Sequence, residues 1–407
     1  MSTPVIDAHP IVAAAEAVLP DVIATRRRLH RRPELGLQLP ETQAVIVEGL
    51  RALGLEPKLG GTSTSVVAVI EGARPGPTIL LRGDMDALPL TEDTGLDFAS
   101  EIPGVMHACG HDTHVAMLLG AARLLVERRG QLAGRVLLMF QPGEEGPHGA
   151  RFMLEEGLLE DGPHGAGSVE RAIAIHISTR YAAGTILVRP GALLASADAI
   201  KGMVRGRGGH ASAPHLSLDP IPTAAELVLA LQAAVTRSID VFDPAVLTIA
   251  RISGGTTNNI IPETVEIEGT IRAVSPATRA AMHELLARVA AGVGATHGTE
   301  VDLQLVPGYP VTMCDPGVTE WVRGVAVGLA GEDRVQVLEH PIMGAEDFSY
   351  VTERVPGMMA FLGARPASED PATAPQNHSN LVVFDEASMA LGVALYAATA
   401  LDFLGGR

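Results

Sequence analysis

Three histidines, one aspartate and one of the chain's two cysteines lie within nine residues of the sequence, in the stretch MHACGHDTH from Met106 to His114. Thiolate and imidazole groups at this spacing can bind a divalent metal, and a cysteine beside a histidine can also act as a nucleophile. The same residues can equally fill a crowded turn. The cluster alone leaves these three interpretations open, so residues elsewhere in the chain must decide among them.

Two adjacent carboxylates in the stretch QPGEEG, Glu144 and Glu145, could supply further metal-site chemistry. If both are buried they repel each other, so a cation or a raised pKa is needed to keep them there. Because the side chains of adjacent residues point in different directions, one can bind a metal while the other faces a substrate as a general base. The alternative interpretation of this motif is a solvated acidic turn.

A site for one or two metal ions draws His, Cys, Asp and Glu ligands from several chain segments and keeps a position open for water. A set of this kind is available in Cys109, His111, Glu145, His176 and His378. Any one of these residues alone is more typical of a structural role. Their combination at predicted loop edges favours a metal site.

The rival interpretation makes Cys109 a thiolate nucleophile that His107 or His111 activates. It explains the cysteine but leaves the glutamate pair and the remaining histidines without a role. A third interpretation is a binding protein without turnover, which should lack a full set of ligands.

Other polar residues suggest supporting and substrate-binding roles. Asp84 and Asp86 in RGDMDA could accept hydrogen bonds from metal-bound imidazoles, or act as turn carboxylates. His210 follows a glycine-rich turn and could stabilise a developing oxyanion, although a surface loop histidine is the default interpretation. Asn259 and Arg272 could bind a substrate carboxylate, because arginine offers two parallel donors; a turn asparagine and a solvated strand arginine are the alternatives.

The order of predicted elements explains how distant residues could meet. Apolar spacing predicts helices between residues 12 and 54, broken near Pro33 and Gly36, followed by alternating strands and helices. We expect neighbouring strands at 65–72 and 77–84, a long amphipathic helix at 113–130, and strands at 134–142 and 171–178. This alternation predicts an α/β fold with a mainly parallel sheet. Ligands of such sheets bind beyond the carboxyl ends of the strands, where the acidic motifs and His176 occur.

The chain's 407 residues exceed what one ordinary core supports, so we expect two domains. The pattern changes near residue 190, and residues 196–298 read as a small α+β unit with an antiparallel sheet. We therefore predict a first domain made of residues 1–190 and 299–407, with residues 191–298 inserted in it.

Composition narrows the possible partners and the compartment. There are 30 basic and 47 acidic residues, a formal charge of −17, which argues against nucleic acid and anionic membranes as partners. No uninterrupted apolar run approaches about 20 residues, the length of a membrane helix, and the first 22 residues lack the basic start of a signal peptide. Two cysteines far apart indicate a reducing compartment, so we expect a soluble, cytoplasmic protein.

Nine motifs occur in an order that identifies a family. They are LHRRPELG, LLRGDMDALPL, MHACGHDTH, FQPGEEG, AIHIS, GGHASAPH, NNIIPETVEIEGTIRA, MGAEDFSY and NHSNLVVFDE. Together they resemble the metal-dependent aminoacylase and carboxypeptidase family, in its branch of hippurate hydrolases, N-acyl-amino-acid amidohydrolases and auxin-conjugate hydrolases. The resemblance runs from about residue 20 to 404.

The resemblance implies a catalytic domain with two divalent ions per subunit, such as Zn, Mn, Co or Ni, and an inserted lid domain that forms a homodimer. The metal ligands it implies are Cys109, His111, Glu145, His176 and His378. It further implies that Glu144 is the general base, Asp86 the supporting aspartate, and His210 a lid residue that reaches the partner's active site. Asn259 and Arg272 match lid residues that hold the substrate carboxylate.

The implied reaction is hydrolysis of small N-acyl amino acids by a metal-activated water. Glu144 would take the proton of this water and pass it to the leaving amine, while His210 helps to stabilise the oxyanion. A dipeptidase or carboxypeptidase on the same scaffold is the alternative enzyme. The segment 177–184, ISTRYAAG, departs from the Pro-containing stretch common in the branch, which puts acyl-group preference and lid closure in question.

Overall fold

The computed structural model describes residues 10–162, 165 and 167–405. The first nine residues, on which part of the signal-peptide argument rests, lie outside the described residues. Contacts divide the chain into two compact units. The first comprises the chain up to Gly191, Met313–Glu339 and the residues from Tyr350 onward; the second comprises Ala192–Thr312 and His340–Ser349.

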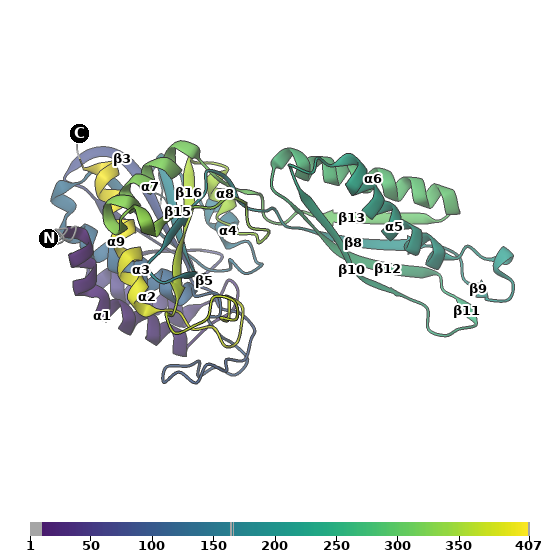
Figure 1. Cartoon of the computed structure of the whole chain (residues 1–407), viewed down its shortest axis with the longest axis horizontal. Helices are drawn as coiled ribbons and strands as arrows, with labels where there is room; N and C mark the ends of the chain where they lie inside the picture. The colour runs from purple at the N-terminus through teal and green to yellow at the C-terminus, as the bar shows by residue number, and fades with distance from the viewer. Residues whose placement is uncertain (1–9, 163–164, 166, 406–407) are drawn as a thin grey trace, which may run out of the picture. The chain divides into compact units, whose positions relative to one another are not determined.

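The first unit is built on an eight-stranded sheet (Figure 1). The strands, in sheet order, are β1 (Lys58–Leu59), β2 (Val66–Glu71), β4 (Ala133–Gln141), β3 (Arg74–Asp84), β5 (Val169–Ala182), β16 (Gly357–Arg365), β6 (Ile186–Val188) and β15 (Val335–Val337). The pairs β4–β3, β3–β5, β5–β16 and β6–β15 are parallel. The predicted α/β class with a mainly parallel sheet is therefore confirmed.

The prediction that strands 65–72 and 77–84 are neighbours is wrong, because β4 lies between them. β2 runs antiparallel to β4, whereas β3 runs parallel to it. The connection from β2 to β3 crosses the start of β4 at close range: a Cβ on Gly72 would lie 2.6 Å from the carbonyl oxygen of Gly134. The almost entirely buried β4 thus takes the inner position, which suits its apolar sequence.

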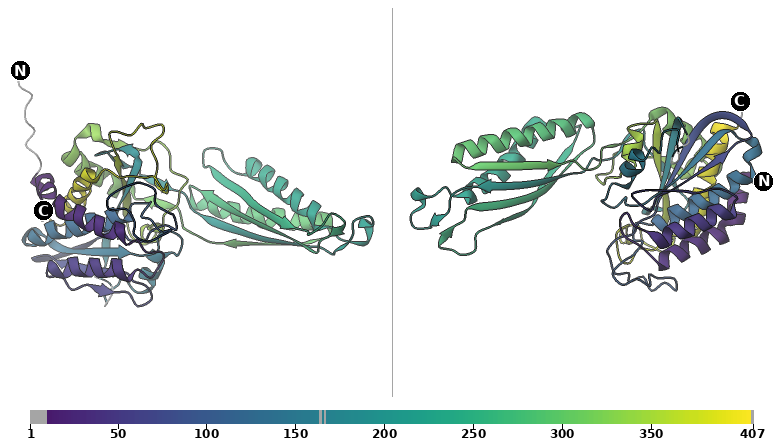
Figure 2. Two further views of the ribbon diagram at one scale, coloured as in Figure 1. Left: turned by 90° about the horizontal axis from the view of Figure 1, so that it is seen from below. Right: turned by 180° about the vertical axis from the view of Figure 1, so that it is seen from behind.

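Helices cover the sheet of the first unit, and α3 (His111–Glu127) is buried on nearly all sides. It contacts β3 and β5 on one side and the helices α1 (Pro10–Arg31) and α9 (Met389–Leu404) on the other. Figure 2 shows the purple N-terminal helices and the yellow C-terminal helix in this unit. The expectation of an amphipathic helix at 113–130 is therefore corrected, because a helix between two layers needs apolar residues all round.

The remaining elements of the first unit and of its crossings into the second include two longer helices and several short pieces. They are α2 (Pro40–Ala52), η1 (Arg129–Gln131), α4 (Gly149–Glu155), β7 (Gly191–Leu194), β14 (Thr312–Cys314), α7 (Pro316–Ala330), η3 (Glu332–Arg334), α8 (Ser349–Thr352) and η4 (Glu386–Ser388).

Within the described part of the chain, one helical segment, Glu386–Leu404, is long and apolar enough to cross a membrane by length and composition. Of its most apolar window, 72% is buried inside the protein. A buried core helix passes the same test, so this segment does not indicate a membrane protein.

The second unit consists of a four-stranded antiparallel sheet with two helices on one face (Figure 1). The strands, in order, are β10 (Ala245–Gly254), β12 (Thr264–Ala273), β8 (Asp198–Arg205) and β13 (Glu300–Val306); the helices are α5 (Pro220–Ser238) and α6 (Pro276–His297). Ile200, Ile267 and Leu286 belong to the core between the sheet and these helices. A two-stranded sheet of β9 (Gly209–His210) and β11 (Ile260–Ile261), with η2 (Pro214–Leu216), completes the unit.

The contact division carries the second unit to Thr312, beyond the predicted boundary at residue 298. The reason is β13, which we expected to return to the first domain but which pairs with β8 along its whole length. The assignment of the two units as a catalytic domain and a lid or dimerisation domain stays a prediction.

Candidate metal centre

The five predicted ligands converge in the first unit, beyond the carboxyl end of β4 and beside the part of β5 that extends past its pairing with β3. His176, predicted near a strand end, lies within β5, which continues to Ala182. Three overlapping groups have ligand atoms within 4.8 Å of one another. These groups are Cys109 with His111 and His176, Cys109 with Glu145 and His378, and His111 with Glu144 and Glu145. The fold thus brings together side chains from four separate segments, although their role as ligands stays a prediction.

Two contacts show how closely the donor atoms approach. Cys109 Sγ lies 3.4 Å from His176 Nε2, and His378 Nε2 lies 3.1 Å from Glu145 Oε1. The Nδ1–H of His176 donates a 2.7 Å hydrogen bond to the carbonyl oxygen of Ile177, so Nε2 keeps its lone pair. A histidine held in this tautomer is ready to bind a metal through Nε2.

The residue that most directly indicates a metal site is His111, which is fully buried. Among the described residues, neither of its ring nitrogens has a partner in hydrogen-bonding geometry; the nearest carboxylate oxygens, of Asp84 and Asp86, are 3.5 Å away. Buried polar atoms almost always have a hydrogen-bond partner, so a buried imidazole without one requires an explanation. Together with a thiol, further imidazoles and a carboxylate, it fits a divalent metal of borderline softness.

The loop that carries Glu144 and Glu145, here called the glutamate loop, is held by Asp86. One carboxylate oxygen of Asp86 accepts the backbone N–H of Glu144 at 2.9 Å, and the other accepts that of Glu145 at 3.0 Å. Gly143 makes the turn possible, because its φ is +71° and a Cβ there would lie 2.6 Å from Leu37. Asp86 Oδ1 also lies 3.5 Å from Nδ1 of His111, so its expected support of a metal-bound imidazole stays a prediction. The structure adds that Asp86 orients the loop carrying both glutamates.

Burial and charge set the protonation of the metal-free cluster. Hydrogen bonds to Cys109 and Glu145 raise the pKa of His378 to about 10. Burial raises the pKa of the Cys109 thiol. Burial alone would lower the pKa of His111, but the neighbouring Asp84 and Cys109 hold it well above its usual value. At neutral pH the metal-free site therefore carries protons that a metal must displace.

These properties argue against Cys109 as a nucleophile. The residue is only 6% exposed, and burial raises the pKa of its thiol, whereas a reactive cysteine needs a lowered pKa and access. A metal can still bind the same sulfur, because coordination displaces the thiol proton. The geometry favours the ligand interpretation of the MHACGHDTH cluster.

Two supporting residues were missed by the sequence analysis. Asn377 donates from its side-chain nitrogen to the carbonyl oxygens of Cys109 and Ile177, both at 3.0 Å, and so ties two ligand-bearing segments together. His378, the next residue, has a left-handed backbone with φ +71°, which is costly for a side chain with a Cβ and is often found at functional sites. The second missed residue is His114, which binds Asp84 and the backbone N–H of Ile177. The NHSN motif was the available signal for Asn377.

The structure places His210 and Asn259 together in the second unit. Ile260 pairs with His210, and the carbonyl oxygen of Asn259 accepts the N–H of Ala211 at 3.1 Å. The backbone N–H of Ser212 donates to His210 Nδ1 at 3.1 Å, so the neutral ring exposes Nε2–H as a donor. Arg272 lies near the other end of β12, about 26 Å along the strand from Thr264. Within this unit, the fold does not bring Arg272 to His210 and Asn259.

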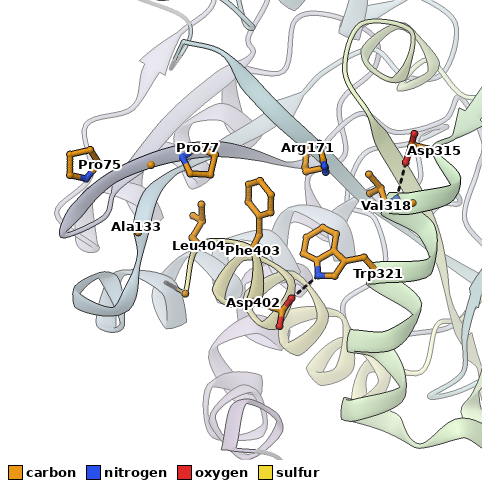
Figure 3. Close-up of a pocket in the computed structure, with 13 residues that line it drawn as sticks. Pro75, Pro77, Ala133, Arg171, Asp315, Val318, Trp321, Asp402, Phe403 and Leu404 are labelled. Carbon is orange, nitrogen blue, oxygen red and sulfur yellow. Dashed lines mark hydrogen bonds between the residues drawn. The ribbon is translucent and has the colours of Figure 1, made fainter. Parts of the chain in front are cut away.

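A separate hollow with a volume of about 830 Å³ opens at the amino ends of β3 and β4 in the first unit (Figure 3). Pro77 and Ala133, at the starts of β3 and β4, line it together with Trp321 and Asp402. The indole N–H of Trp321 donates to Asp402 at 2.6 Å. Because Pro77 and Asp84 are roughly 23 Å apart along β3, this hollow is not part of the metal centre.

Comparison with known proteins identifies the family. The profile of Peptidase family M20/M25/M40 matches residues 80–402. The chain belongs to this family. It is 39% identical to thermostable carboxypeptidase 2 of Saccharolobus solfataricus over 94% of this chain and 95% of that protein. It is 36% identical to an IAA-amino acid hydrolase, ILR1-like 2, of Arabidopsis thaliana over 94% of this chain and 85% of that protein.

Two further similarities concern chemistry and metal content. The chain is 38% identical to N-acetyl-L-cysteine deacetylase of Bacillus subtilis over 84% of this chain and 80% of that protein. A solved structure from Bacillus subtilis, described as a dinuclear metal-binding peptidase of the M20 family, superposes with a TM-score of 0.81 at 33% identity and covers 96% of this chain and 99% of that one. The predicted family and hydrolase class are confirmed, and this M20 enzyme is an amidohydrolase.

The protons on the metal-free cluster predict how metal binding depends on pH. Because bound ligands must be deprotonated, Zn²⁺ uptake should release protons, and affinity should rise with pH toward the raised pKa of His378, about 10. Calorimetric titration of the metal-free protein in two buffers with different ionisation enthalpies measures the release. The His378→Ala variant should release fewer protons. A Zn²⁺ affinity that does not change with pH across the neutral range would contradict this account of the site.

Proposed function

We propose that this amidohydrolase cleaves the amide bond of small N-acyl amino acids, with two divalent ions per chain held by Cys109, His111, Glu145, His176 and His378. The observation that carries the proposal is that the glutamate loop lies beside these donor residues. Ligand atoms of His111, Glu144 and Glu145 are within 4.8 Å of one another. The named activities of the relatives, a deacetylase of N-acetyl-L-cysteine and an IAA-amino acid hydrolase, support an acyl amino acid as substrate.

The chain's own residues divide the work of hydrolysis. When bound, the divalent ions supply Lewis-acid chemistry that acidifies water and polarises an amide carbonyl. Glu144, which is 6% exposed, accepts the proton of the attacking water and delivers it to the leaving nitrogen. Asp86 keeps Glu144 in place through the backbone N–H described above. Zn, Mn, Co and Ni all suit this mixed donor set.

Arg272 is the proposed partner of the substrate carboxylate. It is half-buried on β12, burial lowers its pKa, and it has no ion-pair partner among the described residues. Nearby Asp198 is already engaged, because it accepts two bonds from Arg279, one from His283 and one from the N–H of Gly308. An unpaired, partly desolvated guanidinium is suited to bind an anionic group.

We also infer a homodimer in which His210 and Asn259 act at the partner's active site. β10 is an edge strand, and apolar residues on or near it are exposed, among them Ile252 and Phe242, the latter 93% exposed. Such an edge is a ready site for pairing with another chain. The distance of His210 from Arg272 within one unit also supports a second copy as the supplier of one of them.

A cytoplasmic location remains part of the proposal. Both cysteines are free and buried, which suits a reducing compartment. Fractionation of cells that produce the protein tests the location, and recovery outside the cytoplasm would reject it.

A carboxypeptidase on the same scaffold is the second candidate, favoured by the similarity to thermostable carboxypeptidase 2. It differs in the group on the acyl side of the cleaved bond, which would be a peptide and not a simple acyl cap. A binding protein without turnover would show no dependence on Glu144.

Hydrolysis of a panel of N-acetyl amino acids, N-benzoyl amino acids and peptides is the experiment that tests the proposal. We expect cleavage of the acyl amino acids, loss of activity with chelator and recovery with added metal. Glu144→Gln should keep about two ions per chain by elemental analysis but lower kcat about 10²- to 10⁴-fold, because the general base is lost. The exposed Glu155→Gln on α4 is the matched control and should change nothing.

Three outcomes would contradict parts of this account. Activity that survives complete metal removal but is lost with iodoacetamide would make Cys109 the nucleophile. Cleavage restricted to peptides would establish the carboxypeptidase. Metal binding with no cleavage of any panel member would indicate a binding protein.

Replacing Arg272 tests the carboxylate contact. Arg272→Ala should raise KM roughly 10- to 100-fold for substrates with a free carboxylate, because a charged hydrogen bond contributes about 1.5–3 kcal/mol. Amidated substrates should be spared. Arg288→Ala on α6, where the arginine is exposed, is the control. Equal losses on acids and amides would reject the role of Arg272.

Mixed dimers test whether His210 acts across an interface. Glu144→Gln and His210→Ala homodimers should each be nearly inactive, because one lacks the base and the other an oxyanion donor. Exchange of subunits should restore part of the activity, since one site of the mixed dimer would then have both residues. No recovery, with exchange confirmed by mass spectrometry of tagged subunits, would argue against this arrangement.

A further inference from the structure

The pairing of β3 with β5 ends before the metal centre begins. The last paired residues are Arg82 and Ala174, whereas β5 continues to Ala182 along β16. In the sheet, β3 lies between β4 and β5, and β16 lies on the other side of β5. On the side of β5 that faces β3, the backbone N–H groups beyond Ala174 therefore have no neighbouring strand to bind.

Helix side chains take the place of the missing strand. The hydroxyl of Tyr396, on α9, accepts the N–H of Ile175 at 2.9 Å and donates to the carbonyl oxygen of Arg82 at 2.6 Å. Two residues on, Nε2 of His114 accepts the N–H of Ile177 at 2.8 Å. The first turn of α3 can reach this position because Gly83 has no side chain: a Cβ there would lie 3.0 Å from the carbonyl oxygen of His114.

The bond to Ile177 determines the tautomer of His114. A ring nitrogen that accepts an N–H must carry a lone pair, so the proton of the neutral ring is on Nδ1. That Nδ1–H donates to Asp84 Oδ1 at 2.5 Å. The other oxygen of Asp84 accepts from Arg82 at 2.5 Å, and Arg82 also donates to Gln141 at 2.9 Å. All of these side chains are buried, so water does not compete for their hydrogen bonds.

His114 cannot bind a metal while both of its nitrogens are engaged. Its atoms lie within 4.8 Å of those of Asp84 and His111, so proximity alone would suggest a further ligand group. The ring instead packs edge-on against that of His176, with centroids 4.8 Å apart. Its Nε2 binds the peptide group that joins His176 to Ile177.

The two peptide groups that flank Ile177 are both held by side chains. The N–H of Ile177, in the peptide that joins it to His176, is bound by His114. The carbonyl oxygen of Ile177, in the peptide that joins it to Ser178, accepts from Nδ1–H of His176 and from Asn377. The orientation of the His176 ring, and hence of Nε2 toward Cys109, depends on where this carbonyl points. His114 holds the peptide group before Ile177 and Asn377 the one after it, so together they fix the backbone that carries the ring and the carbonyl that the ring binds.

We propose that His114, held by Asp84 and Arg82, is a positioning residue that sets the orientation of His176 through the backbone of Ile177. This inference rests on the proposed function in one respect, namely that His176 is a metal ligand. Side chains that orient metal-bound histidines typically change metal affinity or activity 10- to 100-fold when they are replaced.

Two substitutions separate the two bonds of His114. In His114→Asn, the amide nitrogen can replace Nδ1–H and donate to Asp84, but nothing accepts the N–H of Ile177. In His114→Gln, the longer side chain can place its amide oxygen where Nε2 was and accept that N–H. Ile79→Ala, in the same buried strand β3 but five residues from Asp84, serves as a control for general loss of stability.

The measurements are the Zn²⁺ dissociation constant by chelator competition, hydrogen exchange at residues 175–178 in the metal-free protein, and the Tm. We expect His114→Asn to weaken Zn²⁺ binding at least tenfold and to speed exchange at Ile177. His114→Gln should stay within a few-fold of wild type in both. Ile79→Ala should lower Tm while Zn²⁺ binding and exchange at 175–178 stay unchanged.

Unchanged Zn²⁺ affinity in His114→Asn would overturn the inference, as would equal losses in the Asn and Gln variants or failure of the Gln variant to fold. A wild-type chain that binds no Zn²⁺ would overturn both this inference and the proposed function. A wild-type chain that binds Zn²⁺ but cleaves no amide would overturn the proposed function alone, because none of these measurements uses hydrolysis.

Discussion

Burial of titratable groups at one edge of a parallel sheet is the constraint on which the rest of this structure depends. Ionised or polar groups taken out of water must find partners, and the interior offers only those that the fold delivers. Here the partners come from many segments, since Cys109, Glu145 and His378 lie far apart in the chain. The donor atoms that remain unsatisfied, above all those of His111, are where the fold fits a cation.

The first turn of α3 shows how this constraint organises its surroundings. His111, Asp112 and His114 are all fully buried, yet each meets a different partner. His111 joins the ligand cluster and His114 bonds to the backbone of β5. Asp112 accepts from Arg26 at 3.0 Å and from His30 at 2.8 Å, both on α1. A helix that carries these three residues in one turn must be enclosed on all sides, which explains why α3 lies between two layers.

The charges of Asp84 and Asp112 are tolerated for the same reason. Burial alone would raise the pKa of each, but Arg82 with two imidazoles holds the pKa of Asp84 well below its usual range, and Arg26 with His30 does so for Asp112. Buried ion pairs add little net stability compared with apolar packing, although breaking one is costly. These pairs are therefore better explained by the positions that they impose on α3 than by the stability that they add.

The sequence by itself determined the residue types, their order and the kind of elements that carry them. The alternation of strands and helices predicted the α/β class, and the acidic motif after the strand that became β4 predicted where Glu144 and Glu145 would lie. These features are local, because a strand end and its side chains are defined within a few residues. Only the tertiary structure placed β4 between β2 and β3, gave Asp86 to the glutamate loop, and directed His114 to Ile177. Each of these depends on which segments meet across the fold, and no spacing along one segment encodes the partner that a buried polar group finds in another.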